Sequence, residues 1–231
     1  MRFEDRAHAG RVLAGMLRGL SGRDCTVLAV PNGGVPVGIR IAEALGAELG
    51  VEIVRKLQIP GNPEAGFGAV TSLGDIILNR FLVKTLGLSQ DQIGRAAAGA
   101  LAELRKRREQ FGPFRPRIEH RTVILTDDGL ASGFTMIAAA RSVRRLGPSS
   151  LIVAVPTAPP ESAGRVGKIA DRVVCPDIRR GLSFAVAGAY ENWYDLSTDE
   201  AVEMLREWRT ARSQRIRPQT REYLPGHTNN P

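Results

Sequence analysis

Short apolar runs alternate along this chain with stretches whose apolar residues recur at helical spacing. The stretch 34–46, for example, places Val37, Ile41 and Leu45 on one face of a helix. A strand, a helix and a second strand in succession give two parallel strands. The pattern therefore predicts an α/β fold, a doubly wound and mostly parallel sheet of about five strands flanked by helices. The predicted strands are residues 26–31, 50–56, 121–126, 150–155 and 171–176.

Two further patterns lie between the second and third predicted strands. Residues 67–72 and 75–79 predict a flap hairpin, and the residues before them, 60–66, have the Pro- and Gly-rich composition of a loop. A helix then begins at a capping-box pattern led by Ser89. It ends in the basic run 105–108, which a solvent-exposed helix face would explain.

The same patterns predict a single domain over residues 1–210. Its core is expected at about 24–177, where strands and helices alternate. The alternation stops after this core, and residues 178–210, together with the N-terminal residues, are expected to form a small hood. Residues 211–231 are polar and basic and contain proline, a composition that predicts a flexible tail.

Composition narrows the functional classes. With 43% hydrophobic and 24% charged residues, the chain of 231 residues has the composition of a globular protein. Its two cysteines and three histidines are too few and too scattered for a disulfide framework or a zinc site. No apolar run approaches a membrane span, and the N-terminus lacks the apolar region of a secretion signal. We therefore expect a soluble, cytoplasmic protein without a membrane partner.

The net charge of +8 comes mostly from arginine, because only four of the 32 Lys and Arg residues are lysine. Such a balance suits a nucleic-acid partner and equally a small anionic substrate. Arginine in particular suits bidentate contacts with phosphate groups. Charge alone therefore leaves both kinds of partner open.

The stretch VILTDDGLASGFT, residues 123–135, carries the most informative chemistry. An apolar strand leads to two adjacent carboxylates, Asp127 and Asp128, and then to a turn of small residues that opens a helix. In an open α/β sheet, ligands bind beyond the carboxyl ends of strands, and a helix N-terminus suits a phosphate. Carboxylates accept hydrogen bonds from sugar hydroxyls or bind a metal with its waters. The combination predicts a site for a ribose 5-phosphate.

At these residues the chain resembles the phosphoribosyl pyrophosphate signature of the type I phosphoribosyltransferases. The residues that match the signature are Asp127, Asp128, Ser132, Gly133 and Thr135. The resemblance extends to one uncharacterised branch of that family through PNGGVPVG (31–38), VRK (54–56), PGNPE (60–64) and GAV (68–70), and it covers about residues 1–210. The signature is specific for phosphoribosyl binding and carries no information on the acceptor.

The resemblance implies roles for the ribose end of the site. The 5′-phosphate would be held, largely through backbone N–H groups, by the loop of Ala131, Ser132, Gly133, Phe134 and Thr135. The catalytic carboxylates Asp127 and Asp128 would face the ribose 2′ and 3′ oxygens. Mg²⁺ would bridge pyrophosphate and the ribose hydroxyls with few direct protein ligands, for which these two aspartates are the candidates.

The pyrophosphate would be bound by a turn of Asn32, Gly33 and Gly34, with an unusual peptide bond such as a cis bond, and by Arg55 and Lys56. Relatives in this branch usually carry Pro-Arg-Gly-Gly at the turn, whereas this chain has Pro-Asn-Gly-Gly. Asparagine keeps the turn chemistry but removes a cation beside an anionic leaving group. Two alternatives stay open. The missing cation is replaced by Arg55, Lys56 or a mobile arginine, or the protein has lost its activity.

The acceptor side is less specific. Glu64 is a candidate for orienting the acceptor, although a loop glutamate can equally be solvated. Four aromatic residues either stack on an acceptor base or pack the hood: Phe184, Tyr190, Trp193 and Tyr194. Residues 79–92 are the candidate for a flexible segment that closes over the site.

The implied reaction displaces pyrophosphate from C1 of phosphoribosyl pyrophosphate by a nitrogenous acceptor such as a nucleobase, with inversion and with Mg²⁺. The alternative is a non-catalytic regulator on the same fold that senses phosphoribosyl pyrophosphate or a nucleotide monophosphate and binds nucleic acid. Asn32, the positive charge and the basic tail favour this alternative. Because the predicted helix 93–108 is rich in Ala and Arg and relatives are commonly dimers, we also expect a two-fold homodimer.

Overall fold

The centre of the molecule is a five-stranded parallel sheet with the strand order β2-β1-β6-β7-β9. The computed structural model describes residues 1–59, 62–72, 74–112, 116–181 and 184–216. The strands of this sheet are β1 (Cys25–Ala29), β2 (Glu48–Val51), β6 (Thr122–Thr126), β7 (Ser150–Ala154) and β9 (Arg172–Val174). The doubly wound parallel sheet predicted from the alternation is therefore confirmed.

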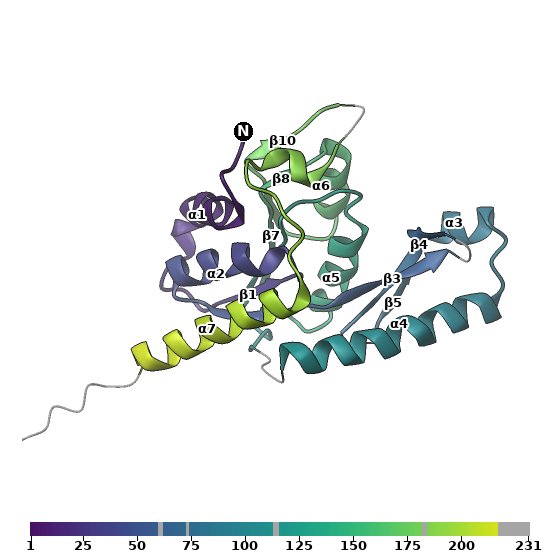
Figure 1. Ribbon diagram of the computed structural model, residues 1–231, viewed down its shortest axis with the longest axis horizontal. Helices are drawn as coiled ribbons and strands as arrows, with labels where there is room; N and C mark the ends of the chain where they lie inside the picture. The colour runs from purple at the N-terminus through teal and green to yellow at the C-terminus, as the bar shows by residue number, and fades with distance from the viewer. Residues whose placement is uncertain (60–61, 73, 113–115, 182–183, 217–231) are drawn as a thin grey trace, which may run out of the picture.

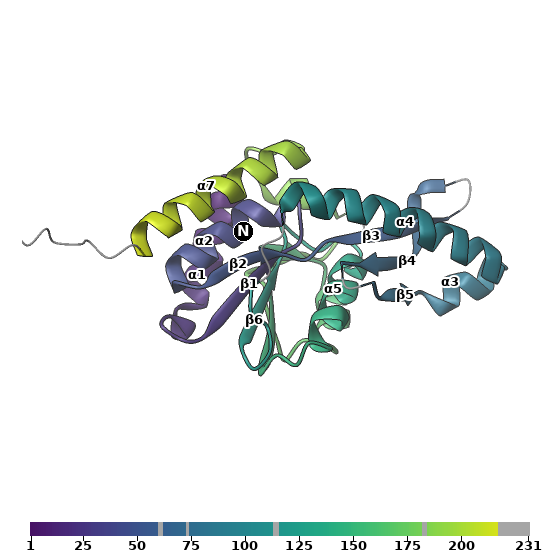
Figure 2. The same cartoon turned by 90° about the horizontal axis from the view of Figure 1, so that it is seen from below.

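Helices cover both faces of the sheet (Figures 1 and 2). On one face lies α2 (Gly34–Leu45), with α1 (Arg6–Met16) and α7 (Thr198–Ile216) packed against it. On the other face lie α5 (Phe134–Arg144) and α6 (Pro160–Val166). The buried residues form one apolar cluster on each face, and β1 contributes to both because its five residues are all buried. Among the described residues, no helix combines the length and apolar character needed to span a lipid bilayer.

The residues that lie between β2 and β6 in the sequence form an arm that projects from the sheet (Figure 1). Its antiparallel sheet has the order β3-β4-β5, and α4 packs along it. The elements of the arm are β3 (Val54–Ile59), β4 (Asn62–Thr71), β5 (Ile76–Leu78), α3 (Arg80–Thr85) and α4 (Gln90–Phe111). The predicted flap hairpin is β4 and β5, and the predicted capping box is present, since Ser89 Oγ accepts from Gln92 N (3.2 Å).

Two predictions in this region are wrong. The predicted strand 50–56 is the end of β2 and the start of β3, two strands in different sheets, because the chain turns at Glu52 and Ile53 into the arm. The predicted loop 60–66 is largely strand, since β4 begins at Asn62; residues 60–61 lie outside the described residues. The segment 79–92, the candidate for closing over the site, contains α3 and the start of α4, which Asn79 and Ser89 cap; its closure stays a prediction.

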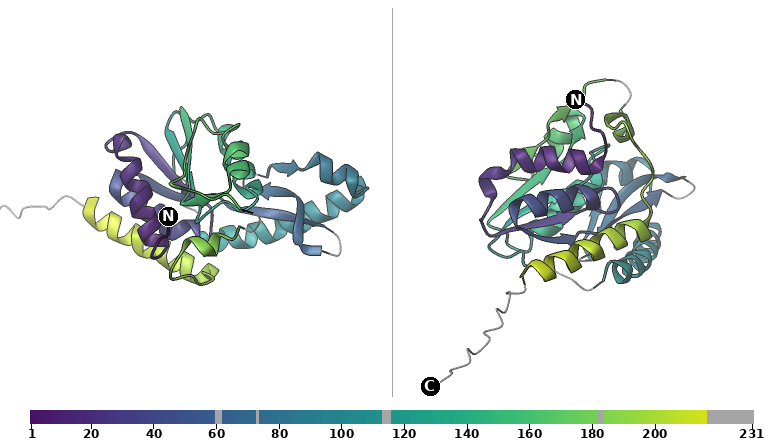
Figure 3. Two further views of the ribbon diagram at one scale, coloured as in Figure 1. Left: turned by 90° about the horizontal axis from the view of Figure 1, so that it is seen from above. Right: turned by 60° about the vertical axis from the view of Figure 1, so that its left-hand side comes forward.

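The hood joins the two ends of the domain. Phe3 forms an isolated bridge with Tyr190, and both side chains are buried with Ala9 and Ala189. The first residue reaches the same region, because the Met1 ammonium group bonds Asp177 Oδ1 (2.7 Å). Figure 3 shows the N-terminus beside this part of the chain. The smaller elements nearby are η1 (Arg18–Leu20), β8 (Thr157–Ala158), β10 (Asp177–Ile178) and η2 (Val186–Ala189).

The last helix runs further than expected. α7 extends to Ile216, past the start of the predicted flexible tail at 211, and residues 217–231 lie outside the described residues. Arg212 explains the extension, because its Nη1 donates to the Ala47 carbonyl (2.7 Å) and its guanidinium lies 5.4 Å from the Trp208 ring. These contacts fix the end of α7 to the turn after α2.

Glu52 is a buried carboxyl at the base of the arm. Its side chain is 4% exposed, and Ser72 Oγ donates to Oε2 (2.8 Å), whereas Oε1 accepts no hydrogen bond from any described residue. Burial raises the pKa of Glu52 to about 7, the Ser72 hydrogen bond opposes that rise, and the charge of Asp75 adds to it. Near neutral pH this carboxyl is therefore only partly ionised.

This shift predicts a pH-dependent stability. Below pH 4.5, the ordinary pKa of a glutamate, Glu52 holds its proton in both the folded and the unfolded chain. As the pH rises, the unfolded chain releases this proton first, so the folded state loses stability until the pH passes about 7. Relative to Glu52→Gln, which cannot titrate, the free energy of unfolding of the wild type should fall by about 3 kcal/mol over this range. Urea unfolding of both proteins at a series of pH values measures the difference. A difference that does not change with pH would contradict the assigned burial of this acid.

Candidate active site

The acid pair and the turn predicted to bind pyrophosphate meet at one edge of the sheet. Asp127 and Asp128 follow the central strand β6, and the turn 31–34 follows the neighbouring strand β1. Because the strands are parallel, their carboxyl ends share that edge. The two segments touch, since a Cβ added at Gly33 would lie 1.8 Å from Asp128 Oδ2 and one at Gly34 would lie 2.8 Å from the Thr126 carbonyl. Glycine is therefore required at both positions of the turn.

The loop 131–135 presents free amide groups at the start of α5. Ala131, Ser132 and Phe134 are exposed, and Gly133 caps the helix with a φ of +76°, a left-handed conformation that favours glycine. In the described part of the chain, the backbone N–H groups of Ser132 and Gly133 have no acceptor, and the first amides of a helix have none within the helix. The loop is therefore open to an anion.

Helix α6 supports this loop from behind. Ser162 Oγ donates to the Ala131 carbonyl (2.6 Å), and Arg165 Nη2 donates to the Ser132 carbonyl (2.8 Å). The Arg165 guanidinium also lies 5.9 Å from the Phe134 ring. These contacts use the carbonyl oxygens of the loop, so its N–H groups remain for a ligand, and Arg165 adds a positive charge that the sequence analysis did not identify.

Asp127 is a half-buried carboxyl at this edge. Its Oδ1 accepts a hydrogen bond from the backbone N–H of Asp128 (2.9 Å). Burial raises the pKa of Asp127 well above its ordinary value, and the negative charge of Asp128 raises it further. Each carboxylate therefore disfavours the ionised form of the other, as expected for adjacent acids.

Asp128 is tied to the hood by a buried ion pair. Arg6 Nε lies 2.8 Å from Asp128 Oδ2, and the two side chains are only 8% and 15% exposed. Burial raises the pKa of Asp128, and the Arg6 guanidinium opposes that rise. Arg6 itself lies over the Trp193 ring at 4.0 Å, and Tyr190 Oη donates to the Asp128 carbonyl (2.6 Å). The hood therefore holds one of the two signature carboxylates in place.

The turn predicted to bind pyrophosphate is approached by an arginine from the arm. The Pro31–Asn32 peptide bond is cis, as the resemblance had suggested. Asn32 Nδ2 donates to the Leu196 carbonyl (2.8 Å), and Arg107 Nη2 donates to Asn32 Oδ1. Arg107 is half-buried, and its Nε has no partner among the described residues. The expectation that the run 105–108 is a solvated face is therefore wrong for this residue.

Arg55 and Lys56, the two basic residues of β3 predicted to bind pyrophosphate, lie on opposite faces of the strand. Arg55 pairs with Glu103 of α4 and lies close to Arg107, whose pKa is lowered by burial and then by the charge of Arg55. Lys56 is exposed and lies on the opposite face of β3, because neighbouring residues in a strand alternate. The structure therefore brings Arg55, and not Lys56, to the side of the arm that faces the turn.

The residues predicted for the acceptor side lie in different environments. Glu64 lies on β4, but its side chain is outside the described part of the structure. Tyr190 packs in the hood and Trp193 lies against Arg6, so both are explained by structure. Tyr194 is 51% exposed and 5.6 Å from the Arg6 guanidinium, which leaves its ring accessible. Phe184 is half-buried.

The donor set suits a metal carried by a substrate better than one bound by protein alone. Within the described ranges, no group of three His, Cys, Asp or Glu side chains is placed to hold a metal ion. Asp128 is engaged by Arg6, whereas Asp127 is held only from within its own strand end, through the bond from the Asp128 N–H to its Oδ1. Mg²⁺ commonly keeps its waters and binds through one or two carboxylates plus substrate phosphates, and Asp127 fits that arrangement.

Comparisons with known proteins concern the domain as a whole. The model of the phosphoribosyl transferase domain matches residues 4–189. Two Mycobacterium tuberculosis proteins, from strains H37Rv and CDC 1551, have names that place them provisionally among the phosphoribosyl transferases. Each is 40% identical to this chain over 205 residues, which are 88% of this chain and 46% of the relative. The chain thus spans about half the length of these curated relatives.

A solved structure supports the fold over nearly the whole chain. The crystal structure of TT1426 from Thermus thermophilus matches with a TM-score of 0.76 and 38% sequence identity, over 90% of this chain and 99% of that one. The matched range, residues 4–189, includes Asp127 and Asp128, the loop 131–135 and the turn 31–34. The chain therefore belongs to the phosphoribosyl transferase domain family.

Proposed function

We propose that this protein transfers a phosphoribosyl group from phosphoribosyl pyrophosphate to a nitrogenous acceptor such as a nucleobase, releasing pyrophosphate. The observation that carries the proposal is the meeting of three parts at one sheet edge: the acid pair, the open loop 131–135 and the turn 31–34. Each part suits one part of that substrate, the ribose, its 5′-phosphate and its pyrophosphate.

The loop binds the 5′-phosphate and thereby orients the sugar. Its free amides and the N-terminus of α5 attract an anion, and Arg165 behind the loop adds to this field. The ribose then lies toward Asp127, whose carboxyl accepts hydrogen bonds from the ring hydroxyls. As the bond from C1 to pyrophosphate breaks, positive charge grows on the sugar, and an ionised Asp127 stabilises it.

Mg²⁺, when bound with the substrate, supplies positive charge to the pyrophosphate and to the ribose hydroxyls. The protein supplies the rest of the charge at the leaving group. The turn 31–34 approaches pyrophosphate closely because it has no side chains at Gly33 and Gly34. Arg107, bound to Asn32, places a cation next to that turn, and Arg55, paired with Glu103, lies close to Arg107. This arrangement replaces the cation that the asparagine at position 32 removes.

The acceptor enters from the hood. Tyr194 presents an accessible ring beside Arg6, and aromatic side chains of this kind stack on planar bases. Glu64 remains the predicted orienting group, and a two-fold homodimer remains the predicted assembly. Cross-saturation of Tyr194 by a bound base tests the stacking. Light scattering at micromolar concentration tests the homodimer.

The function is tested by pyrophosphate release. Purified protein, phosphoribosyl pyrophosphate, Mg²⁺ and a panel of purine and pyrimidine bases should give stoichiometric pyrophosphate and a ribonucleotide with at least one base. Binding of phosphoribosyl pyrophosphate without turnover, together with salt-sensitive binding of RNA or DNA, would instead support the regulatory alternative. Absence of phosphoribosyl pyrophosphate binding would exclude both.

The acid pair should respond unequally to neutral substitutions. Asp127→Asn imitates the neutral form that burial favours, so its melting temperature should match the wild type while turnover falls by about 100-fold. Asp128→Asn removes the charge partner of buried Arg6 and should lower stability by about 2 kcal/mol as well as turnover. Calorimetry and kcat for the two variants test this. Equal stability of both would contradict the Arg6 ion pair.

Arg107 should act on the pyrophosphate end of the substrate. Arg107→Ala should raise KM for phosphoribosyl pyrophosphate by about tenfold, since one charged hydrogen bond is worth roughly 1.5–3 kcal/mol. Arg105→Ala, an exposed neighbour on the same helix, is the matched control and should leave KM unchanged. Adding Asn32→Arg to Arg107→Ala returns a cation to the turn and should recover part of the loss. Equal effects of the two alanine variants would remove Arg107 from the site.

A further inference from the structure

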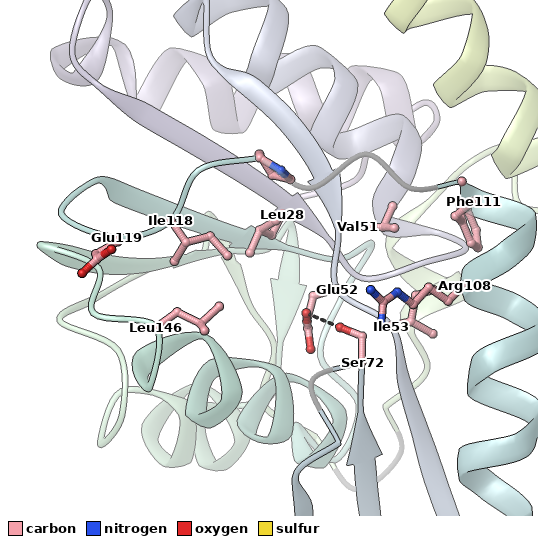
Figure 4. A pocket seen from close by; sticks show the side chains of 12 residues that line it. Leu28, Val51, Glu52, Ile53, Ser72, Arg108, Phe111, Ile118, Glu119 and Leu146 are labelled. Atoms are coloured by element: carbon pink, nitrogen blue, oxygen red, sulfur yellow. Dashed lines mark hydrogen bonds between the residues drawn. The ribbon is translucent and has the colours of Figure 1, made fainter.

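Two cavities lie beside the arm, and they differ in charge. The one at the base of the arm is lined by charges of both signs, Glu52, Glu119 and Arg108 (Figure 4). The other, called here the arm–core cavity, has residues of β4, β5 and the start of α3 on one side. On its other side are residues of α5, of α6 and just after α6. Its volume is about 640 Å³, within the range of pockets that hold small molecules.

The charged side chains of the arm–core cavity are all positive. Arg80 comes from the arm, and Arg141, Arg165 and Lys168 come from the core, where α5 lies beside the strands of the arm (Figure 2). None of the described residues that line the cavity is Asp or Glu. A cleft lined by charge of one sign raises the local concentration of counter-ions. The cavity therefore suits a ligand with several negative charges.

Three of these cations have no partner in the described parts of the chain. The side chains of Arg80, Arg141 and Lys168 form no hydrogen bond or ion pair there. By contrast, the next arginine after Arg141 along the chain, Arg144, pairs with Asp171 (2.7 Å). Like charges that face one cavity without counter-charges repel each other, and a bound anion would remove that repulsion.

The surface between the cations is apolar. The Phe134 ring is 46% exposed, and it lines the cavity with Ile77, Leu78, Ile137 and Ile169. An inorganic anion would leave this surface in contact with water. A ligand that joins a planar ring to a chain of phosphates would cover it, because aromatic side chains stack on nucleic-acid bases.

We propose that the arm–core cavity binds a nucleotide with a chain of phosphates, a nucleoside di- or triphosphate. The base lies against Phe134, and the phosphates contact Arg80, Arg141 and Lys168. Because Arg80 belongs to the arm and the other two cations belong to the core, the bound phosphates link the two parts of the molecule.

The arm–core cavity adjoins the loop 131–135 but is a different site. It shares the side chain of Phe134 with that loop, and Arg165 supports the loop from behind. The acid pair and the turn 31–34 do not line it. The loop offers backbone N–H groups to an anion, whereas the cavity offers cationic side chains. The inference thus concerns a second ligand and does not rest on the proposed function.

Three compounds that carry all or part of the ligand test the site. ATP has a base and phosphates, tripolyphosphate has the phosphates alone, and adenosine has the base alone. ATP represents the class, since stacking is tolerant of the base. Titration calorimetry should show saturable binding of ATP, with tripolyphosphate and adenosine each weaker by about tenfold or more. Phe134→Leu removes the ring and should weaken ATP by about tenfold while leaving tripolyphosphate unchanged.

Substitutions on both sides of the cavity locate the phosphates. Arg80→Ala and Arg141→Ala should each weaken ATP by about tenfold, since each removes a charged hydrogen bond. Both side chains are exposed, so melting temperatures should match the wild type. Lys84→Ala is the matched control, because Lys84 is an exposed cation one turn after Arg80 that does not line the cavity. It should change the affinity little. Equal effects of the three variants would overturn the inference.

Competition separates the arm–core cavity from the neighbouring loop. Saturating ribose 5-phosphate should leave ATP binding in place, and displacement of ATP would assign ATP to the loop and overturn the inference. No saturable binding of ATP, or tripolyphosphate binding as tightly as ATP, would also overturn it. A single-stranded oligonucleotide that binds more tightly than ATP, and that loses affinity in the same variants, would assign the surface to nucleic acid instead. A protein that binds ATP here but releases no pyrophosphate from phosphoribosyl pyrophosphate would contradict only the proposed function.

Discussion

Two carboxylates placed side by side at the end of a buried strand repel each other, and the structure around the site is arranged to accommodate them. The repulsion and burial raise the pKa of Asp127 well above its ordinary value, while Asp128 is compensated by Arg6 at 2.8 Å. Compensation requires the N-terminal helix to lie over the sheet edge, and it requires Trp193 beneath the guanidinium. The N-terminal helix is thus attached to the core through the charge of one of the two signature carboxylates.

The same constraint explains the glycine turn. Since Asp128 Oδ2 occupies the space where a Cβ of Gly33 would lie, the turn after β1 packs directly on the acid pair. Ribose and pyrophosphate are adjacent in the proposed substrate, so the elements proposed to bind them must be adjacent in the protein. Parallel neighbouring strands provide that adjacency, because both chains leave the sheet at the same edge. The fold therefore determines the spacing of the site before any ligand is bound.

The sequence predicted the elements whose signals are local. The apolar run before Asp127, the small residues of 131–135 and the capping box at Ser89 each specify their structure within a few residues, and the sheet and the loop followed from them. Long-range contacts were not predictable in this way. No sequence pattern near Arg6 or Arg107 distinguishes them from the other arginines of the chain, which has 28. Only folding brings Arg6 to Asp128 and Arg107 to Asn32. The split of the predicted strand 50–56 was missed for the same reason, because apolar residues continue through the turn at Glu52.

The cation beside the turn 31–34 is Arg107, which belongs to the arm and not to the core sheet. An arginine within the turn would be fixed by the core sheet, whereas Arg107 is carried by α4, which packs along the antiparallel sheet of the arm. The charge at the pyrophosphate end then depends on where the arm lies relative to the core. The chain crosses from core to arm at Glu52, a carboxyl that is buried, incompletely hydrogen-bonded and half ionised near neutral pH. The arm therefore leaves the core at an acid whose protonation changes near neutral pH, three residues before Arg55 and beside the helix that carries Arg107.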